Sequence, residues 1–529
     1  MSSKRETWRT TSRPRRSAIL ISALCVLAVA PKAWPQMDTL GVPQWARVDH
    51  QLALKVHESD TSHQPPGIFP PLLTRFVRSP DPSGTVETFN LAAPTLTVSN
   101  PFFQSLGTNG RACATCHEPR SGWGVSAASI QQRFKASGGT DPIFRLIDGA
   151  TCPTDDTSTF DAKRDAYRLL LSKGLIRVFL PLPADQIGTD PPVPTDYEIA
   201  SVTDPYGCTD LSAQPPIVSV YRRPLPSANL RFLTECPPGV SSCPPLAIMS
   251  DGREPSLESQ ANDATLIHAQ AASAPTDDQI AQIVDFEAQI YDAQVRDNVA
   301  GKLDVDGATG GPVFLAQQNF YIGINDVLGG DPLNPGVFTP EVFTLYEGWQ
   351  GGTVSDGHNA GRQAIARGEA LFNTKPFTIS GVNGLNLFPF DPVGANAITG
   401  TCTTCHDSPN VGNHSKKLAI DIGVSDADPP VLDVSRLPVF TIACTDTNGP
   451  LQGQVFRVTD PGRALISGKC ADVGKVKGPI LHALAARAPY FHNGSVAALD
   501  DVVNFYDQRF GIGLTDQEKA DLVAFLKTL

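Results

Sequence analysis

Cys113-Ala114-Thr115-Cys116-His117 is a C-x-x-C-H motif, and a second copy stands at Cys402-Thr403-Thr404-Cys405-His406. In each copy two cysteines stand three positions apart and a histidine follows directly. Two thiols at this spacing can add to the two vinyl groups of one haem, and the adjacent imidazole then reaches the iron from one face. The two copies therefore predict two covalently bound haem c groups, attached through the four cysteines and ligated by His117 and His406.

A C-x-x-C pair has two other common uses, a zinc site and a thioredoxin-like redox pair. Zinc would require a second pair of Cys or His ligands nearby, and a thioredoxin would require a strand-helix-strand setting. Neither is evident around residues 113–117 or 402–406. Covalent haem is therefore the favoured interpretation of both motifs.

The composition describes a long, acidic and loop-rich chain. Its 529 residues suggest about two to four domains. Lys and Arg number 42 against 54 Asp and Glu, for a net charge of -12, and charged residues make up only 18%. This balance disfavours a nucleic-acid partner and a basic membrane-binding surface. The 44 Gly and 46 Pro residues predict many loops, while 41% hydrophobic residues are enough for a globular fold.

The first 33 residues have the three parts of a secretory signal peptide. Basic residues come first, an apolar run follows over residues 17–30, and small residues stand at Ala28, Ala30 and Ala33. We therefore expect residues 1–33 to be a signal peptide and the protein to be periplasmic. The apolar run is short for a bilayer span, which makes an uncleaved anchor the weaker alternative, and no other segment is expected to be an integral membrane segment.

Six further cysteines remain beyond the signal peptide and the two motifs, an even number that suits disulfides in an exported chain. Because they lie near each other in sequence, Cys236 is expected to form a disulfide with Cys243, and Cys444 with Cys470. Cys152 then remains for Cys208. The sequence does not fix this connectivity, and buried free thiols are the alternative.

An internal repeat supports a two-domain organisation. Thr276–Phe286 aligns without gaps on Thr515–Phe525, and in both segments a Thr and a Gln or Glu three positions later form a capping box ahead of an apolar stripe. Each segment is therefore predicted to be a helix that closes a haem domain, and Gly361–Phe372 to be the helix that opens the second domain. The apolar stripe of the first helix is expected to run on to Ile290.

These patterns predict a mainly α-helical fold with two cytochrome c-like haem domains, loop-rich insertions and an N-terminal extension. The expected segments are residues 1–33 (signal peptide), 34–97 (N-terminal extension), 98–299 (first haem domain with insertions), 300–360 (connector) and 361–529 (second haem domain). The stretch from Cys152 to Cys243 and the Pro-rich stretch Pro181–Pro194 are expected to be surface loops.

Methionine is too scarce to supply a ligand to the second iron. Beyond the signal peptide only Met37 and Met249 remain, and neither follows the second motif, where a c-type domain would usually provide its sixth ligand. Most of the other candidates are expected to be structural. The candidates downstream of the second motif are His414, His482, His492, Tyr490 and Tyr506.

Beyond the two motifs, two further segments give the chain a resemblance to the bacterial di-haem cytochrome c peroxidase and MauG superfamily. They are Ser250-Asp251-Gly252-Arg253 with Leu257 and Gln260, and Ala488-Pro489-Tyr490-Phe491-His492-Asn493-Gly494-Ser495 with the final helix. The resemblance covers roughly residues 98–529, with insertions. It implies a peroxide-binding haem in the N-terminal domain and an electron-transfer haem in the C-terminal domain.

The resemblance also assigns the sixth ligand of the second haem. In the superfamily this ligand lies fourteen residues after the His of the Y-F-H-x-G segment, Met in peroxidases and Tyr in MauG, and counting from His492 gives Tyr506. A Tyr ligand favours a low potential and storage of an oxidising equivalent. The alternatives are a core tyrosine at position 506 and His492 as the ligand, although the resemblance places His492 near a haem propionate.

At the first haem the chain departs from the superfamily. Ser250 stands where the superfamily usually has a Trp that bridges the two haems, so the electron path is left open, with Trp123 and Trp349 as other aromatic candidates. The next histidine after His117 is His268, so no distal histidine follows the motif closely. This spacing favours an iron with an open position.

Three residues are predicted to serve the reaction at the first haem. Gln260 matches a distal Gln of the superfamily, and the position of its catalytic Glu falls on Gln270. A Gln cannot relay a proton as a carboxylate does, whereas a histidine titrates in the required range, so His268 is the predicted acid-base group. A histidine without a role on a helix face is the alternative.

The resemblance makes calcium a further candidate cofactor. The superfamily holds this ion between its domains, partly through main-chain carbonyls that would here lie near Arg487 and Pro489, with Asn229 as a side-chain contributor. Carbonyl ligands leave almost no trace in a sequence.

We therefore predict a periplasmic di-haem c-type oxidoreductase, peroxidase-like, that reduces hydrogen peroxide, or oxygen, at the first haem. Electrons would come through the second haem from a donor such as a small cytochrome or a cupredoxin. A MauG-like or rubber-oxygenase-like oxidase or oxygenase is the alternative enzyme, and a di-haem electron carrier without catalysis is the alternative outside enzymes.

Overall fold

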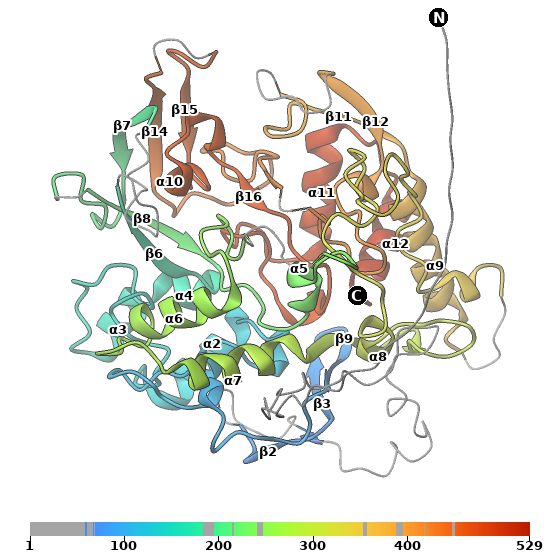
Figure 1. The fold of residues 1–529 in the computed structure, drawn as a ribbon, viewed down its shortest axis with the longest axis horizontal. Helices are drawn as coiled ribbons and strands as arrows, with labels where there is room; N and C mark the ends of the chain where they lie inside the picture. Colours follow the sequence, from blue (N-terminus) through green and yellow to red (C-terminus); the bar gives the residue numbers. More distant parts are fainter. Residues whose placement is uncertain are drawn as a thin grey trace, which may run out of the picture. The chain divides into compact units, whose positions relative to one another are not determined.

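The computed structural model is 28% helical and 19% strand, so the expectation of a mainly α-helical fold is wrong. Figure 1 shows helices interleaved with many small sheets. The difference arises because the insertions, expected to be loop-rich, and the N-terminal extension, for which no structure was predicted, both form paired strands. The description covers residues 59–60, 67, 69–182, 195–213, 216–240, 247–352, 357–387, 395–416, 418–446 and 450–529.

The described residues form helices in both halves of the chain. The α-helices are α2 (Ala127–Ser137), α3 (Phe160–Ala166), α4 (Arg168–Lys173), α5 (Arg231–Thr234), α6 (Leu257–Ile267), α7 (Asp277–Ala288), α8 (Pro312–Leu315), α9 (Asn359–Thr374), α10 (Ala464–Ser467), α11 (Leu499–Phe510) and α12 (Asp516–Leu526). The 3-10 helices are η2 (Pro101–Phe103), η3 (Cys113–Thr115), η4 (Pro119–Ser121), η6 (Glu347–Trp349), η7 (Cys402–Thr404), η8 (Cys470–Asp472) and η9 (Leu484–Ala486).

Within the described residues the strands are short and belong to six sheets. They are β1 (Ser59–Asp60), β2 (Leu72–Leu73), β3 (Phe76–Asp81), β4 (Gly84–Asn90), β5 (Thr95–Leu96), β6 (Ile176–Pro181), β7 (Tyr197–Thr203), β8 (Ile217–Arg222), β9 (Ile290–Asp297), β10 (Gly301–Lys302), β11 (Phe377–Ser380), β12 (Ala397–Gly400), β13 (Ala419–Ile420), β14 (Val439–Cys444), β15 (Val455–Val458) and β16 (Val476–Lys477).

The N-terminal extension contributes most of the largest sheet, whose strand order is β1-β3-β4-β9-β10. β4 pairs antiparallel with β9, from Gly84 opposite Asp297 to Asn90 opposite Ile290. Ile290, expected on the helical stripe, therefore begins a strand, because α7 ends at Ala288. The extension is thus built into the fold beside the first motif.

The insertions in the two halves of the chain form a joint sheet with the order β15-β14-β7. β14 pairs antiparallel with β7, which comes from the first half, and Figure 1 shows these strands side by side. Val218 and Val220 of β8 and Phe440 and Ile442 of β14 lie in one buried cluster. The described parts of the Cys152–Cys243 stretch thus contain three strands and the helices α3, α4 and α5, which corrects the expectation of surface loops alone; residues 183–194 lie outside the described residues.

The two capping boxes and the helices that they begin are confirmed. Thr276 caps α7 and Thr515 caps α12. In each helix the N3 side chain accepts a hydrogen bond from the backbone N–H of the cap residue. The helix expected at Gly361–Phe372 is present as α9, which packs against α12. The cluster beneath these helices contains Phe343, Tyr346 and Trp349, so the expected connector supplies part of the core.

Two of the three predicted disulfides are confirmed. Cys152 is bonded to Cys208, and Cys444 is bonded to Cys470. The predicted partner of Cys236, Cys243, lies outside the described residues, as does the signal peptide predicted at 1–33. Among the helices that the structure describes, none has the length and apolar character needed to cross a membrane.

Candidate functional site

The two C-x-x-C-H motifs fold in the same way. Each begins with a 3-10 turn, η3 or η7, and a threonine hydroxyl accepts a bond from the residue before the turn, Thr115 from Ala112 at 2.9 Å and Thr404 from Thr401 at 3.0 Å. The four motif cysteines are free and half-buried. None of them belongs to a metal-binding group of three His, Cys, Asp or Glu side chains within the described part of the chain. The arrangement fits thioether attachment better than a dithiol pair or a zinc site.

Both motif histidines are held by their Nδ1 atoms. His117 Nδ1 lies 2.8 Å from the Trp123 carbonyl oxygen, and His406 Nδ1 lies 2.6 Å from the Gly412 carbonyl oxygen. Burial lowers the pKa of both rings, so each is neutral and donates its Nδ1 proton. Nε2 is then the free lone-pair donor, as ligation of a haem iron requires.

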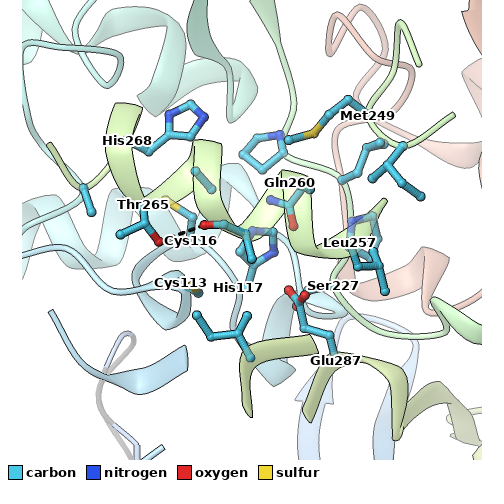
Figure 2. A pocket seen from close by; sticks show the side chains of 18 of the residues that line it. Cys113, Cys116, His117, Ser227, Met249, Leu257, Gln260, Thr265, His268 and Glu287 are labelled. Carbon is cyan, nitrogen blue, oxygen red and sulfur yellow. Dashed lines mark hydrogen bonds between the residues drawn. The ribbon is translucent and has the colours of Figure 1, made fainter. Parts of the chain in front are cut away.

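A largely apolar cavity opens around the first motif, and α6 and α7 form much of its wall (Figure 2). Leu257, Ala261 and Ile283 supply apolar surface to this cavity. Such a lining suits the flat, apolar body of a porphyrin. The first motif therefore has space beside it for the predicted haem.

Two basic side chains at the cavity lack carboxylate partners within the described residues. Burial and the neighbouring Arg487 lower the pKa of Arg223 to about 9, and its Nε has no hydrogen-bond partner. Burial lowers the pKa of Lys477 to about 8, and Nζ donates to the Ala247 carbonyl at 2.8 Å. Haem propionates would compensate both charges. The sequence alone pointed to neither residue.

His492, predicted near a haem propionate, is buried beside the Arg222–Asp460 ion pair. Its Nε2 lies 3.6 Å from Asp460 Oδ2 without forming a hydrogen bond, and burial lowers its pKa to about 4. Arg222 also lines the cavity of the first motif. His492 is thus close to the cavity wall but is not itself a lining residue.

Tyr506 lies on α11 close to the second motif. Its pKa is raised by burial and by the nearby Cys405 and Cys402 thiols. Aromatic rings surround it, with Phe505 at 5.6 Å and Phe510 at 6.2 Å between ring centroids. The structure therefore brings Tyr506 to the second predicted haem, and its ligand role stays a prediction.

The other ligand candidates for the second iron have different partners. His482 is buried with its Nε2 2.8 Å from the Asn410 carbonyl, and the Tyr490 hydroxyl donates to the Leu484 carbonyl at 2.9 Å. His414 lies beside Asp407.

The three predicted reaction residues separate into two groups. Gln260 and His268 line the cavity with His117. Gln270 is exposed, has a positive φ of 54° and does not line the cavity; its side-chain oxygen accepts a bond from Asn109 at 3.2 Å. Gln260 and His268 therefore lie at the same cavity as His117 and Gln270 does not, and the roles of all three stay predictions.

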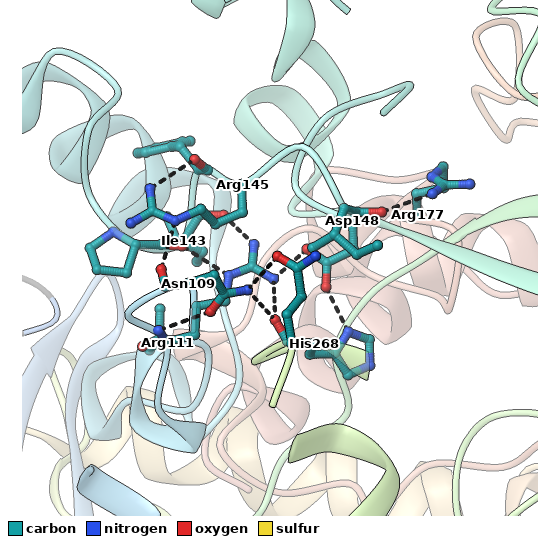
Figure 3. Close-up of polar contacts among 12 residues, drawn as sticks. Asn109, Arg111, Ile143, Arg145, Asp148, Arg177 and His268 are labelled. Atoms are coloured by element: carbon teal, nitrogen blue, oxygen red, sulfur yellow. Dashed lines mark hydrogen bonds and ion pairs between the residues drawn. The ribbon is translucent and has the colours of Figure 1, made fainter. Parts of the chain in front are cut away.

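The His268 ring is held by the buried carboxylate of Asp148, a contact that sequence reasoning missed (Figure 3). Its Nδ1 lies 2.6 Å from Asp148 Oδ2, and the other oxygen of Asp148 binds Arg111. Burial raises the pKa of Asp148, but Arg111 and His268 outweigh this and hold it below its ordinary value. The His268 side chain is 29% exposed, whereas Asp148 is 2% exposed. No spacing in the sequence links Asp148 to His268.

Glu287 is a second residue that sequence reasoning missed. It lies on α7, lines the cavity and is 4% exposed, and its Oε2 has no hydrogen-bond partner. Burial raises its pKa to about 8, so the side chain is largely a neutral acid at pH 7. The signal was present in the sequence: position 287 is one helical turn from Ile283 and so falls on the apolar stripe.

The residues proposed for an electron path and for calcium are placed as follows. Ser250 lines the cavity, and its carbonyl accepts a bond from the Lys477 backbone. Trp123 is fully buried and adjoins His117 through its carbonyl, whereas Trp349 stacks on Tyr346. Both ends of the Asn229 amide bind the Asp292 backbone, so that side chain is already engaged.

Together, these features define a c-type haem protein site with a histidine-lined cavity, and comparisons with known proteins agree with that class. Cytochrome-c peroxidase IdrP2 from Denitromonas iodatirespirans is 36% identical over 137 residues, which are 25% of this chain and 36% of that protein. Cytochrome-c peroxidase IdrP1 from the same organism is 30% identical over 144 residues, 24% of this chain and 36% of that protein. The chain thus spans about a third of the length of these curated relatives.

Two other comparisons add little. No family model matches the chain. A solved MauG-like protein associated with microbial copper homeostasis aligns over 59% of this chain and 76% of its own, with 19% identity and a TM-score of 0.26, too low to support any conclusion. The curated relatives nevertheless confirm the resemblance to cytochrome c peroxidases.

Proposed function

We propose that this protein is a periplasmic di-haem c-type peroxidase that reduces hydrogen peroxide at the haem of the first motif. Electrons would reach that haem through the second one, from a small cytochrome or a cupredoxin. The named peroxidase relatives support the reaction class. The basic and apolar N-terminal residues support export.

The observation that carries the proposal is the His268–Asp148 pair in the same cavity as His117. A bound haem c would supply the redox-active iron at which peroxide is reduced. Cys113 and Cys116 would attach it, His117 would ligate it, and Arg223 and Lys477 would hold its propionates. The second motif offers the same attachment and ligand atoms, with Tyr506 nearby.

Within the cavity, the chain's own groups would move the proton. The Nδ1 proton of His268 is held by the Asp148 carboxylate, so Nε2 is the atom that can accept a proton from bound peroxide and return it to the departing oxygen. The Gln260 amide can orient the peroxide by hydrogen bonding. Leu257 and Ala261 keep this part of the cavity apolar and limit access of water.

The test is donor oxidation by purified holoprotein with hydrogen peroxide and a reduced small cytochrome or cupredoxin. We expect peroxide-dependent oxidation of the donor, and an electron paramagnetic resonance spectrum of the resting protein with one high-spin and one low-spin ferric centre. Two low-spin centres without donor oxidation would contradict the peroxidase proposal and indicate an electron carrier. Oxygen-dependent turnover of an organic substrate without peroxide activity would contradict the peroxidase proposal and indicate an oxygenase.

A further inference from the structure

Asp326, Asp407 and His414 form a buried cluster outside the haem cavity. One donor atom from each lies within 4.8 Å of the other two. Asp326 and Asp407 have no exposed surface, and His414 is 7% exposed. The cluster joins the segment after β10 to the loop that follows the second motif, because Asp407 directly follows His406.

Each carboxylate in the cluster uses one oxygen for the backbone and leaves the other free. Asp326 Oδ2 accepts a bond from the Gly330 backbone at 2.7 Å, and Asp407 Oδ1 accepts one from the Ser415 backbone at 2.6 Å. Asp326 Oδ1 and Asp407 Oδ2 are buried without a hydrogen-bond partner, and so is His414 Nδ1. Three donor atoms are thus held in place and unsatisfied, which is costly unless a ligand occupies them.

The separation of two of these atoms suits ligands of one metal ion. His414 Nδ1 and Asp407 Oδ2 lie 3.1 Å apart but are not aligned as a hydrogen bond. Two ligands on one tetrahedral ion, each at about 2.0–2.1 Å from it, lie about 3.3 Å apart. The observed separation therefore needs little adjustment to admit the ion.

The charge of the cluster also favours a cation. Two carboxylates face one ammonium group, because Lys416 Nζ lies 3.1 Å from Asp326 Oδ2 and is itself 40% exposed. Lys416 therefore balances only one of the two carboxylates, and the buried cluster keeps a negative charge. Nearby, Ser408, Asn413 and Ser415 each have a buried side-chain oxygen without a partner. A divalent cation would neutralise the charge and give the loop further contacts.

We propose that Asp326, Asp407 and His414 bind a divalent transition-metal ion, with zinc as the ion that suits them best. An imidazole nitrogen combined with two carboxylate oxygens is a zinc-type ligand set, whereas calcium takes oxygen ligands almost entirely. The ion would brace the loop that carries His406. This site is separate from the predicted calcium site near Asn229 and does not depend on the peroxidase reaction.

The first test is metal content. The holoprotein is dialysed with zinc, manganese or calcium, and metal is measured by mass spectrometry, with haem iron as the internal count of chains. We expect one equivalent of zinc per chain, bound more tightly than manganese or calcium. Absence of bound zinc, or a preference for calcium, would overturn the proposal.

The second test uses variants of the ligands. Asp326→Asn and His414→Gln are each expected to weaken zinc binding by at least on the order of tenfold. Asp421→Asn, which changes a half-buried aspartate outside the cluster, should bind zinc as the unaltered protein does. Unchanged zinc affinity in both ligand variants would refute the assignment.

A third measurement does not depend on whether the variants fold. Crystals of the unaltered holoprotein grown with zinc are measured on both sides of the zinc absorption edge. We expect an anomalous peak among Asp326, Asp407 and His414. A peak elsewhere, with none at this cluster, would show that bound zinc has another site.

Discussion

His268 illustrates how a residue acquires a chemical role from neighbours that the sequence does not place beside it. Its ring is held by Asp148, which in turn binds Arg111, and all three lie at or near the wall of the first cavity. A free histidine would rotate and exchange tautomers. The pair with a buried carboxylate holds Nδ1 and leaves Nε2 as the atom proposed to move the proton.

We predict that His268→Ala lowers peroxide-dependent donor oxidation by on the order of 10²–10⁴-fold, because general acid–base catalysis contributes about that much. Asp148→Asn should also lower it, since an amide no longer holds the imidazole in one tautomer. Steady-state rates with a reduced small cytochrome measure both. His358→Ala, at a half-buried histidine whose Nδ1 contacts the Val299 carbonyl outside the cavity, is the control. Equal rates in His268→Ala and the control would refute the role of His268.

Glu287 predicts a pH dependence of stability. Burial raises its pKa from 4.5 to about 8. Between these values the folded protein binds a proton that the unfolded chain has lost, so the free energy of unfolding decreases as pH rises through this window. Glu287→Gln should remove that decrease, which amounts to on the order of a few kcal/mol.

Urea unfolding of the holoprotein measures this effect. The measurement is made at several pH values between about 5 and 8, because the pKa of Glu287 is raised to about 8. The variant should gain stability relative to the unaltered protein as the pH increases. Parallel curves for the two proteins would mean that Glu287 ionises normally. Asp421→Asn would not be a suitable control here, because the pKa of Asp421 is itself raised by burial, to about 7.

At this scale the sequence predicted the groups that define a covalent motif and missed those that depend on distant contacts. Cys113, Cys116 and His117 follow from a local spacing with a chemical reason. Asp148 approaches His268 from 120 positions away, and no periodicity marks such a pair. Gln270 was selected by its position in a related pattern; it is exposed and is not among the residues that line the cavity, and its role stays a prediction.

Among the elements, the helices with capping boxes were the most predictable. Thr276 and Thr515 accept hydrogen bonds from the N3 backbone N–H of α7 and α12. The Gln or Glu side chain at N3 in turn accepts one from the backbone N–H of the cap residue. All of these contacts lie within four residues, so the sequence contains them completely. The strands of the insertions were missed because their partners lie far along the chain: β7 is held by β14, and its own pattern of buried residues is weak.

We predict that Thr515→Ala lowers the free energy of unfolding by about 1 kcal/mol, because it removes the side chain that satisfies the Glu518 backbone N–H. Thr515→Ser retains the hydroxyl and should be close to neutral. Thermal unfolding followed by circular dichroism distinguishes the two. A larger loss in the serine variant than in the alanine variant would mean that the cap is not the source of the effect.

For the whole molecule, the joint sheet has an energetic consequence. Phe440 of β14 is fully buried in a cluster that also contains Val218 and Val220 from the first half. Phe440→Ala should therefore cost about 3–5 kcal/mol, the usual loss for a buried phenylalanine. Because both halves share this cluster, the loss should appear in a single unfolding transition.

Denaturant unfolding followed in the Soret band and by far-ultraviolet circular dichroism tests this expectation. Coincident midpoints that shift together in Phe440→Ala would support one cooperative unit. If one signal shifted and the other stayed in place, the halves would unfold independently. Thr441→Ser, at a half-buried position of the same strand, is the conservative control.

The pairing of β7 with β14 also bears on how the chain is made. With the proposed export, β7 would reach the folding compartment before β14 and would carry an open edge until β14 follows. Such an edge can recruit the wrong neighbour from another copy. Chaperone protection during this interval, and low yields when expression is fast, would follow from the order in which the two strands arrive.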